Sequence, residues 1–217
     1  MVKIKRTSVP KLLAKTNKAF KAEIDGKSPK EAYEIYKEKK DKYKYNTEET
    51  KRFFRKMNYE KCSFCTKHIS DFDDEMTVEH IKTKKDYPKY IYQWSNLLCA
   101  CKTCNTKRST KKYIKKKYLD PSKIDNIEEY FCYKLDGKID VNKELDIESQ
   151  EKANYMIELY KLNREELVCK RREFLKDLME DDDYFEILKN KNFNSQNIIF
   201  LSVFAYYSKR YEENYGK

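Results

Sequence analysis

The sequence predicts a mainly α-helical protein with a small core that combines short β-strands and a metal site. The first observation is a set of two Cys-x-x-Cys pairs, Cys62/Cys65 and Cys101/Cys104, with 35 residues between them. Helix start signals recur on both sides of these pairs, which is the second. The third is that residues 76–81 and 130–141 have the composition of β-strands. Together these features predict helices around a small metal-stabilised core, and they argue against an all-β protein and against a membrane protein.

The chain is expected to divide into three regions. Residues 1–60 are predicted to form a helical arm, residues 61–118 the metal-stabilised core, and residues 119–217 a hairpin followed by helices. The length of 217 residues fits one compact domain or two small ones. No apolar run approaches the roughly 18 residues that span a bilayer, and no signal-peptide core follows the basic N-terminus. We therefore expect a cytoplasmic protein without membrane contact.

Capping residues predict the helices of the arm. Pro10 can begin a helix that runs through Phe20. Ser28-Pro29-Lys30-Glu31 places a cap residue, proline and an acid at the positions of a capping box. A third helix begins near Glu48, where either Asn46 or Thr47 can be the cap. The arm shows no residues with evident chemistry.

The C-terminal region is expected to contain one hairpin and several helices. A helix after Cys104 is predicted to run to about Lys117. Asp136-Gly137 is predicted as the two-residue turn of the hairpin. Further predicted features are a helix at 148–160, a helix capped by Asn163 with Glu166 that ends near Met179, a solvated acidic run at 180–183, and a last helix at 195–211.

The two cysteine pairs predict a structural zinc site. Zinc takes four soft ligands in a tetrahedron, and two residues between paired cysteines let both thiolates of a turn face one ion. Disulfides are the alternative, but they are rare in intracellular proteins. Cys99 is separated from Cys101 by one residue, and we interpret it as a small buried apolar residue.

An acid–histidine pair lies between the cysteine pairs. Glu79 and His80 lie in Met76-Thr77-Val78-Glu79-His80-Ile81, whose β-branched residues favour a strand. Successive strand residues face opposite sides, so the carboxylate can hold a metal while the histidine faces a water. Histidine is the usual general base near neutral pH. The alternative is a structural histidine, which the position between two Cys-x-x-Cys pairs disfavours.

The segment resembles an HNH endonuclease of the ββα-metal type. The matching positions are Glu79-His80, Asn96-Leu97 and Asn105. The resemblance implies that His80 is the general base. It also implies that Asn96 holds the strands in register and orients the histidine. Glu79 and Asn105 would bind one divalent cation, Mg²⁺ or Mn²⁺.

A closer resemblance is to the HNH subunit of Septu-type and retron-linked anti-phage defence systems. It is carried by the run from Glu79 to Asn105, by Tyr118-Leu119-Asp120-Pro121, and by Leu162-Asn163-Arg164-Glu165-Glu166-Leu167. In that family the nuclease works with an ABC-like ATPase subunit. The resemblance therefore implies such a partner for this chain.

Positive charge is concentrated on the core. Residues 82–117 contain twelve basic residues and one acid, a net charge of +11 that equals the formal net charge of the whole chain. Clustered positive charge beside a metal site is typical of a phosphate-backbone binder, although some lysines are expected to be merely solvated. The candidate nucleic-acid contacts are Lys82, Lys84, Lys85, Lys107, Arg108, Lys111 and Lys112.

These features predict a metal-dependent endonuclease acting on nucleic acid, with DNA as the expected substrate. The alternative is a zinc module that binds nucleic acid without cutting it. Such a module keeps the cysteines and lysines but does not need Glu79, His80 or Asn105. The presence of all three favours the enzyme.

Overall fold

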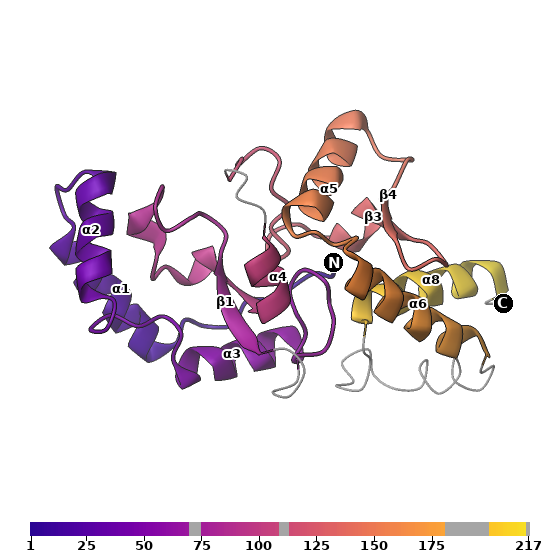
Figure 1. The fold of residues 1–217 in the computed structure, drawn as a ribbon, viewed down its shortest axis with the longest axis horizontal. Coiled ribbons are helices and arrows are strands. Elements are labelled where there is room, and N and C mark those ends of the chain that lie inside the picture. The colour runs from indigo at the N-terminus through magenta and orange to yellow at the C-terminus, as the bar shows by residue number, and fades with distance from the viewer. Residues whose placement is uncertain (70–74, 109–112, 181–199, 216–217) are drawn as a thin grey trace.

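The computed structural model describes residues 1–69, 75–108, 113–180 and 200–215. The chain is mainly helical with two small antiparallel strand pairs, as predicted. Figure 1 shows the molecule as elongated, with the N-terminal helices at one end, the C-terminal helices at the other, and β1 and α4 between them. None of the helices in the described part is long and apolar enough to cross a bilayer.

Three helices form the arm: α1 (Lys11–Glu23), α2 (Pro29–Lys39) and α3 (Glu48–Asn58). The capping box of α2 is present, because Ser28 Oγ accepts from the Glu31 amide and the Glu31 carboxylate accepts from the Ser28 amide. Thr47 is the cap of α3, where its hydroxyl accepts from the Thr50 amide at 3.2 Å. The local signal therefore predicted where α2 begins, and the structure decides between the two possible caps of α3 in favour of Thr47.

The centre of the molecule is the pair β1 (Met76–His80) and β2 (Leu97–Cys101), followed directly by α4 (Lys102–Lys107). The strands are antiparallel, with Glu79 opposite Leu98 and His80 opposite Leu97. Every residue of β2 is buried. Helix α3 contacts both strands, and the ring of Phe54 stacks on Trp94 with centroids 4.7 Å apart. This order of strand, strand and helix is consistent with the expected ββα core.

Helix α4 is much shorter than predicted. It ends at Lys107 instead of continuing to about Lys117. Arg108 leaves the helical conformation, with φ −50° and ψ 124°. Its guanidinium turns back to the carbonyl oxygens of His80 and Ile81. These tertiary hydrogen bonds hold Arg108 outside the helix, so α4 ends at Lys107.

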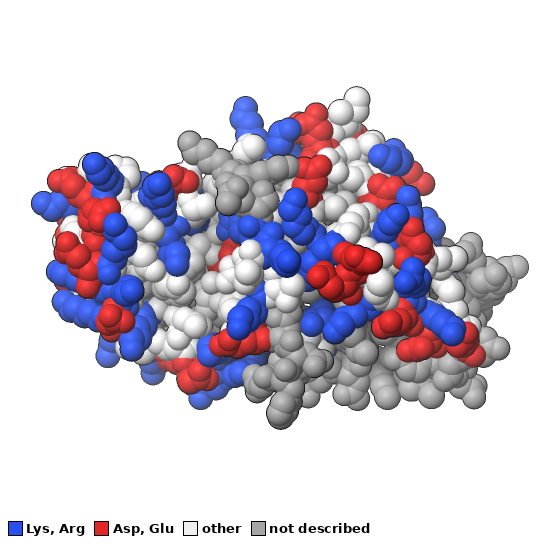
Figure 2. Space-filling view, viewed as in Figure 1, with Lys and Arg blue, Asp and Glu red and all other residues white. Residues whose placement is uncertain are grey.

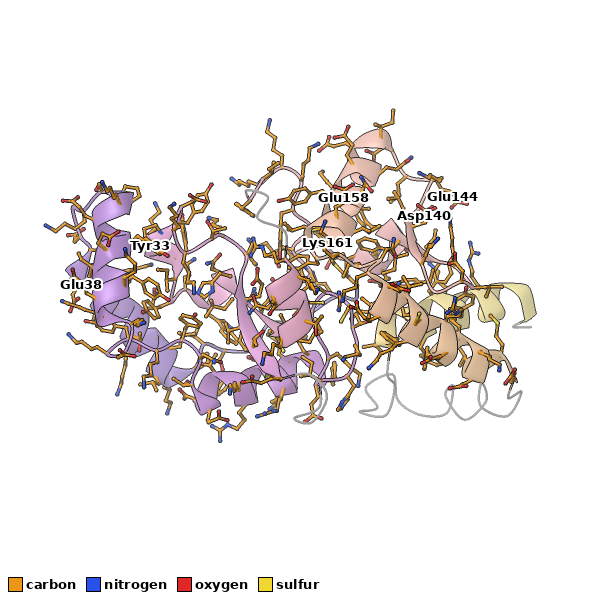
Figure 3. All side chains as sticks on the ribbon, viewed as in Figure 1. Tyr33, Glu38, Asp140, Glu144, Glu158 and Lys161 are labelled. Atoms are coloured by element: carbon orange, nitrogen blue, oxygen red, sulfur yellow. The ribbon has the colours of Figure 1, made fainter. Side chains whose placement is uncertain are left out.

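The C-terminal half contains β3 (Phe131–Tyr133), β4 (Ile139–Val141), α5 (Ile147–Leu159), α6 (Glu165–Glu180) and α8 (Leu201–Tyr215). Asp140, labelled in Figure 3, lies on β4, where its carboxylate pairs with Lys134 at 2.8 Å. Residues 181–183 of the predicted acidic run and 195–199 of the predicted last helix lie outside the described residues.

Two predictions about this half were wrong in detail. The hairpin is closed by three residues, since the Lys134 amide bonds the Lys138 carbonyl and Asp136-Gly137 forms only the end of the connection. The side chain of Asn163 does not complete a capping box for α6. Its amide instead bonds both the N–H and the C=O of Ile139, at 2.8 and 2.7 Å, as a neighbouring strand would.

The hairpin packs tightly on α6. Gly137 has φ +86°, and a Cβ there would overlap the Val168 carbonyl oxygen and lie 2.9 Å from the Arg172 amide nitrogen. The buried Arg171 also donates to the Gly137 and Leu162 carbonyls, and burial lowers its pKa to about 10. Glycine at position 137 thus permits both the turn and the close approach of α6.

Gly137→Ala is predicted to destabilise the protein by about 3 kcal/mol or more, which a urea unfolding curve would measure. The left-handed conformation costs an L-residue roughly 1–2 kcal/mol, and the overlap with α6 adds a similar amount. Gly26→Ala is the matched control, because Gly26 has φ +68° but no atom within 4 Å of the place that a methyl group would occupy. Equal losses in the two variants would show that packing on α6 contributes nothing.

Candidate functional site

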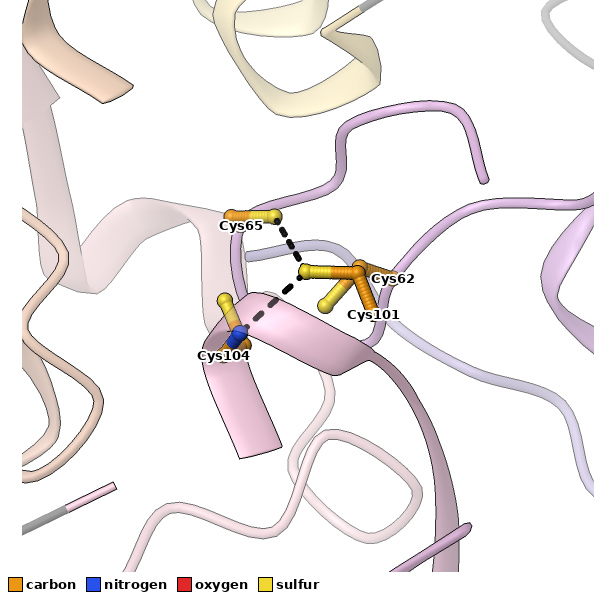
Figure 4. A group of neighbouring side chains, drawn as sticks. All are labelled: Cys62, Cys65, Cys101 and Cys104. Carbon is orange, nitrogen blue, oxygen red and sulfur yellow. Dashed lines mark hydrogen bonds between the residues drawn. The ribbon is translucent and has the colours of Figure 1, made fainter. Parts of the chain in front are cut away.

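Four cysteines from two segments converge in the interior. Cys62 and Cys65 lie in the turn after α3, Cys101 ends β2, and Cys104 lies in the first turn of α4. All four are buried, and their sulfur atoms lie within 4.8 Å of one another (Figure 4). The Cys65 and Cys101 sulfurs are 3.9 Å apart, close to the roughly 3.8 Å that a tetrahedron with Zn–S bonds of about 2.3 Å requires. The predicted cluster therefore exists and can hold a metal ion.

Cys99 lies outside this group. It is fully buried on β2, opposite Val78. Burial raises the pKa of its thiol well above the ordinary value, so Cys99 remains a neutral side chain. This placement agrees with its interpretation as a small apolar residue.

The C-terminal half closes over the cysteine cluster. Both terminal nitrogens of the Arg164 guanidinium lie 3.6 Å from the Cys104 sulfur. Phe64, between the first two cysteines, stacks on Tyr160 with ring centroids 3.7 Å apart. A positive charge beside the cluster favours thiolates over thiols, and thiolates are the metal-binding form.

Helix α4 lies against one face of β1. Thr77 and Glu79 share that face because strand residues two apart point the same way. The Asn105 side-chain nitrogen donates to the Thr77 hydroxyl at 3.0 Å. Three residues later, Arg108 forms an ion pair with Glu79. The two predicted cation ligands, Glu79 and Asn105, thus lie on facing surfaces of β1 and α4.

Glu79 is not open to solvent. Its exposed fraction is 4%, and its carboxylate is neutralised by the Arg108 guanidinium. The same guanidinium donates to the His80 carbonyl at 2.5 Å and the Ile81 carbonyl at 3.1 Å. Arg108 therefore connects the end of α4 to the end of β1 and to the residue that follows it. The sequence suggested a nucleic-acid contact for this residue, whereas in the structure its charge is paired.

His80 points away from the Glu79 face and is also buried, with 5% of its surface exposed. Its Nε2 lies 3.0 Å from the Ile91 carbonyl oxygen, and the ring of Tyr45 packs edge-on with centroids 4.6 Å apart. Burial, aided by the positive charge of Lys84, lowers the pKa of His80 to about 3. The ring is therefore neutral. Because a carbonyl can only accept, Nε2 carries the proton and Nδ1 is left as the basic nitrogen.

Asn96 closes the loop that connects β1 to β2. Its side-chain oxygen accepts from the Lys82 amide at 2.8 Å, and its nitrogen donates to the Lys82 and Tyr90 carbonyls. Its backbone oxygen accepts from the Ile81 amide. Asn96 thus pins the residues directly after His80 and the loop that contains Ile91, the hydrogen-bond partner of His80.

The predicted cationic contacts occupy different environments. Lys82 lies over the ring of Tyr90 at 3.7 Å, and Lys84 bonds the Tyr45 hydroxyl at 3.1 Å. Lys85 and Lys107 are exposed. Lys111 and Lys112 lie outside the described residues. On the face drawn in Figure 2, basic side chains are spread over the coloured part of the surface with acidic ones between them.

Sequence reasoning missed three contacts of the site. Thr77, which orients Asn105, shares a strand face with Glu79 and could have been found from that alternation. Tyr45 reaches His80 from the arm, and Arg164 reaches Cys104 from the start of α6. Neither has a local signal, because each contact joins residues at least 35 positions apart.

Comparison with known proteins agrees with this geometry. Residues 62–111 match the HNH endonuclease family. The chain is also similar to the Septu protein PtuB of Bacillus thuringiensis, with 35% identity over 85 residues. That match covers 38% of this chain and about one third of the relative, 33% of its length. The resemblance stated from the sequence is confirmed to this extent: residues 62–111 match the HNH endonuclease family, and 85 residues of the chain are similar to a Septu protein.

Proposed function

We propose that this chain is an endonuclease that hydrolyses phosphodiester bonds of nucleic acid, with DNA as its expected substrate. The family match over residues 62–111 is the observation that carries the proposal. It is supported by the arrangement of β1, β2 and α4, which gathers the four predicted catalytic and cation-binding residues: Glu79, His80, Asn96 and Asn105.

His80 is the proposed general base. A neutral imidazole whose Nε2 donates to a backbone carbonyl has its other nitrogen free to take a proton from water. The Ile91 carbonyl fixes the tautomer and the ring orientation, and Asn96 fixes the loop that supplies this carbonyl. Asn96 would therefore act as a positioning residue.

Glu79 and Asn105 are the proposed ligands of a divalent cation, Mg²⁺ or Mn²⁺. A carboxylate and an amide oxygen are the donors that such hard cations prefer. The bond from Asn105 to Thr77 uses the amide nitrogen and leaves the oxygen as the ligand. When bound, the cation would supply charge stabilisation at the phosphate and the leaving oxygen. The residues fit this role provided that Arg108 gives up its ion pair with Glu79.

Zinc is the proposed occupant of the cysteine cluster. Four buried cysteines whose sulfur atoms lie within 4.8 Å of one another match a closed structural zinc site with no position left for a substrate. The role of this metal would be to hold β2, α4 and the turn after α3 together.

We further propose that the chain works in anti-phage defence with an ABC-like ATPase subunit in the cytoplasm. The support is the similarity to a Septu protein and the resemblance of the Leu162–Leu167 motif to the same family. Copurification of the two subunits from cells that express both would test the partnership.

A second candidate function is a zinc module that binds nucleic acid without cutting it. The observation that favours it is the closed state of the site: Glu79 is paired with Arg108, and His80 is buried beneath Tyr45. The first candidate cleaves nucleic acid and needs His80 to do so, whereas the second binds nucleic acid without cleaving it.

Zinc is predicted at one ion per chain. Cys101→Ser combined with Cys104→Ser should abolish zinc binding, because half of the ligand set is lost. Cys99→Ala is the matched control, since this cysteine is equally buried but lies outside the cluster. Elemental analysis of protein purified without chelator measures the stoichiometry. Full zinc content in the double variant would exclude this site.

His80→Ala is predicted to lower the cleavage rate by roughly 10²–10⁴-fold, the usual contribution of a general base. Cleavage of plasmid DNA with Mg²⁺ or Mn²⁺, with and without the ATPase subunit, measures it. His68→Ala is the control, because His68 is the other of the two histidines and pairs with Glu60 instead. If the His80 variant retains its zinc and cuts at the wild-type rate, the enzyme mechanism is wrong and the binding module is favoured.

Arg108→Ala is predicted to tighten Mn²⁺ binding by about tenfold or more. The guanidinium competes with the cation for Glu79, and a hydrogen bond to a charged group contributes about 1.5–3 kcal/mol. Electron paramagnetic resonance of free Mn²⁺, on the zinc-loaded chain, measures affinity without any cleavage. Arg108→Lys retains a competing charge and should bind Mn²⁺ nearly as the wild type does. Weaker Mn²⁺ binding in a folded Arg108→Ala protein would mean that the arginine organises the site rather than competing for it.

A further inference from the structure

A cavity of about 320 Å³ lies beside the candidate site. Its walls come from the residues directly after β1, from the loop before β2, and from residues 113–124. Asn96, which pins the chain after His80, forms part of the wall together with Lys82. The cavity therefore begins one to two residues beyond the proposed general base. A nucleic acid with its scissile phosphate at His80 would place a neighbouring nucleotide here.

The charge of the cavity suits a phosphate. Three lysines, Lys82, Lys115 and Lys123, line it together with one carboxylate, that of Asp120. This carboxylate is already engaged, because Asp120 Oδ1 accepts from the Ser122 amide and hydroxyl at 3.0 and 2.7 Å. Its other oxygen lies 3.7 Å from the Lys123 ammonium. The lining therefore carries a net positive charge that can attract an anion such as a phosphate.

Three tyrosines line the cavity, of which Tyr118 is buried. Tyr90 and Tyr113 line it, and both are only partly buried. Tyr113 is held against Tyr87 in an edge-to-face contact, with ring centroids 5.8 Å apart. The ammonium groups of Lys82 and Lys89 lie 3.7 and 5.3 Å from the Tyr90 centroid, and the charge of Lys82 lowers the pKa of Tyr90. The Lys82 ammonium covers one face of the Tyr90 ring, so a base would stack on the opposite face or on Tyr113. Aromatic rings combined with ammonium groups bind the bases and the backbone of single-stranded nucleic acid.

The geometry points to a pocket for one unpaired nucleotide next to the scissile phosphate. This inference rests on the proposed function and narrows its substrate. A base can stack on a tyrosine only after it has left the duplex stack, so the pocket favours a bulge, a flipped base or a single-stranded junction over a regular duplex. A volume of about 320 Å³ is at the small end of ligand pockets and suits a single nucleotide.

The test compares two DNA probes of the same sequence and length. One is a perfect duplex, and the other has a single unpaired 2-aminopurine as a bulge. Binding is followed by fluorescence anisotropy in the His80→Ala background, so that cleavage does not interfere. The wild-type pocket should bind the bulged probe more tightly. Tyr90→Leu should remove most of this preference, roughly tenfold in affinity, while binding of the perfect duplex stays unchanged.

Tyr33→Leu is the matched control. Tyr33, labelled in Figure 3, is a partly buried tyrosine on α2 with the Lys37 ammonium 5.6 Å from its ring, but it does not line the cavity. Its variant should keep the full preference for the bulge. Equal affinity of the two probes, an equal loss of both in Tyr90→Leu, or the same loss in Tyr33→Leu would each overturn the pocket.

The outcomes separate this inference from the proposed function. A preference for the bulge in a protein that never cuts DNA would support the pocket and reject the nuclease. Cleavage of a perfect duplex without any preference for the bulge would support the nuclease and reject the pocket. Displacement of the bulged probe by polyglutamate, but not by an unlabelled oligonucleotide of equal charge, would reject a nucleotide as the ligand.

Discussion

Four sulfur atoms within 4.8 Å of one another, all buried, set the constraint on which the structure depends. As thiolates they would carry four negative charges, and a divalent ion would cancel only two. Arg164 approaches Cys104 and offsets part of the remainder. The cluster also fixes the junction of β2 and α4, because Cys101 ends one and Cys104 lies in the other. Asn105 follows directly, so the cluster that organises the core also positions a residue proposed for catalysis.

Electrostatic balance also explains why the candidate active site is closed. An isolated carboxylate with 4% exposure would be costly, since burying an unpaired charge is strongly unfavourable. Arg108 offsets this cost for Glu79, and it also donates to the carbonyl oxygens of His80 at the end of β1 and of Ile81 directly after it. His80 avoids the same cost by being neutral. In the proposed mechanism a divalent cation would replace Arg108 as the partner that neutralises Glu79, and it would also stabilise charge on the substrate phosphate.

Local signals in the sequence predicted the features that depend on neighbouring residues. The cysteine spacing, the strand at β1 and the cap at Ser28 belong to this kind, and for α3 the local signal left Asn46 and Thr47 as the two possible caps. The length of α4 and the role of Asn163 were predicted wrongly, because partners distant in the sequence decide them. The same reason applies to the candidate site: Glu79 and His80 could be proposed from the motif, but their contacts with Arg108 and Tyr45 could not be predicted. Glu79 and Arg108 are 29 positions apart in the sequence, and His80 and Tyr45 are 35 apart, so neither contact produces a periodic pattern of residues.

The surroundings of His80 show that the motif is not the whole structural unit. The histidine contacts the loop before β2 through Ile91 and the arm through Tyr45. The Tyr45 hydroxyl in turn accepts from Lys84, and the Tyr92 hydroxyl donates to the Tyr43 carbonyl. Phe20 of α1 packs on Tyr92 with centroids 4.9 Å apart, which extends the contact into the arm's core. A boundary at residue 60 would separate His80 from the ring that buries it. The pKa of the proposed base is therefore a property of the arm as well as of the HNH segment.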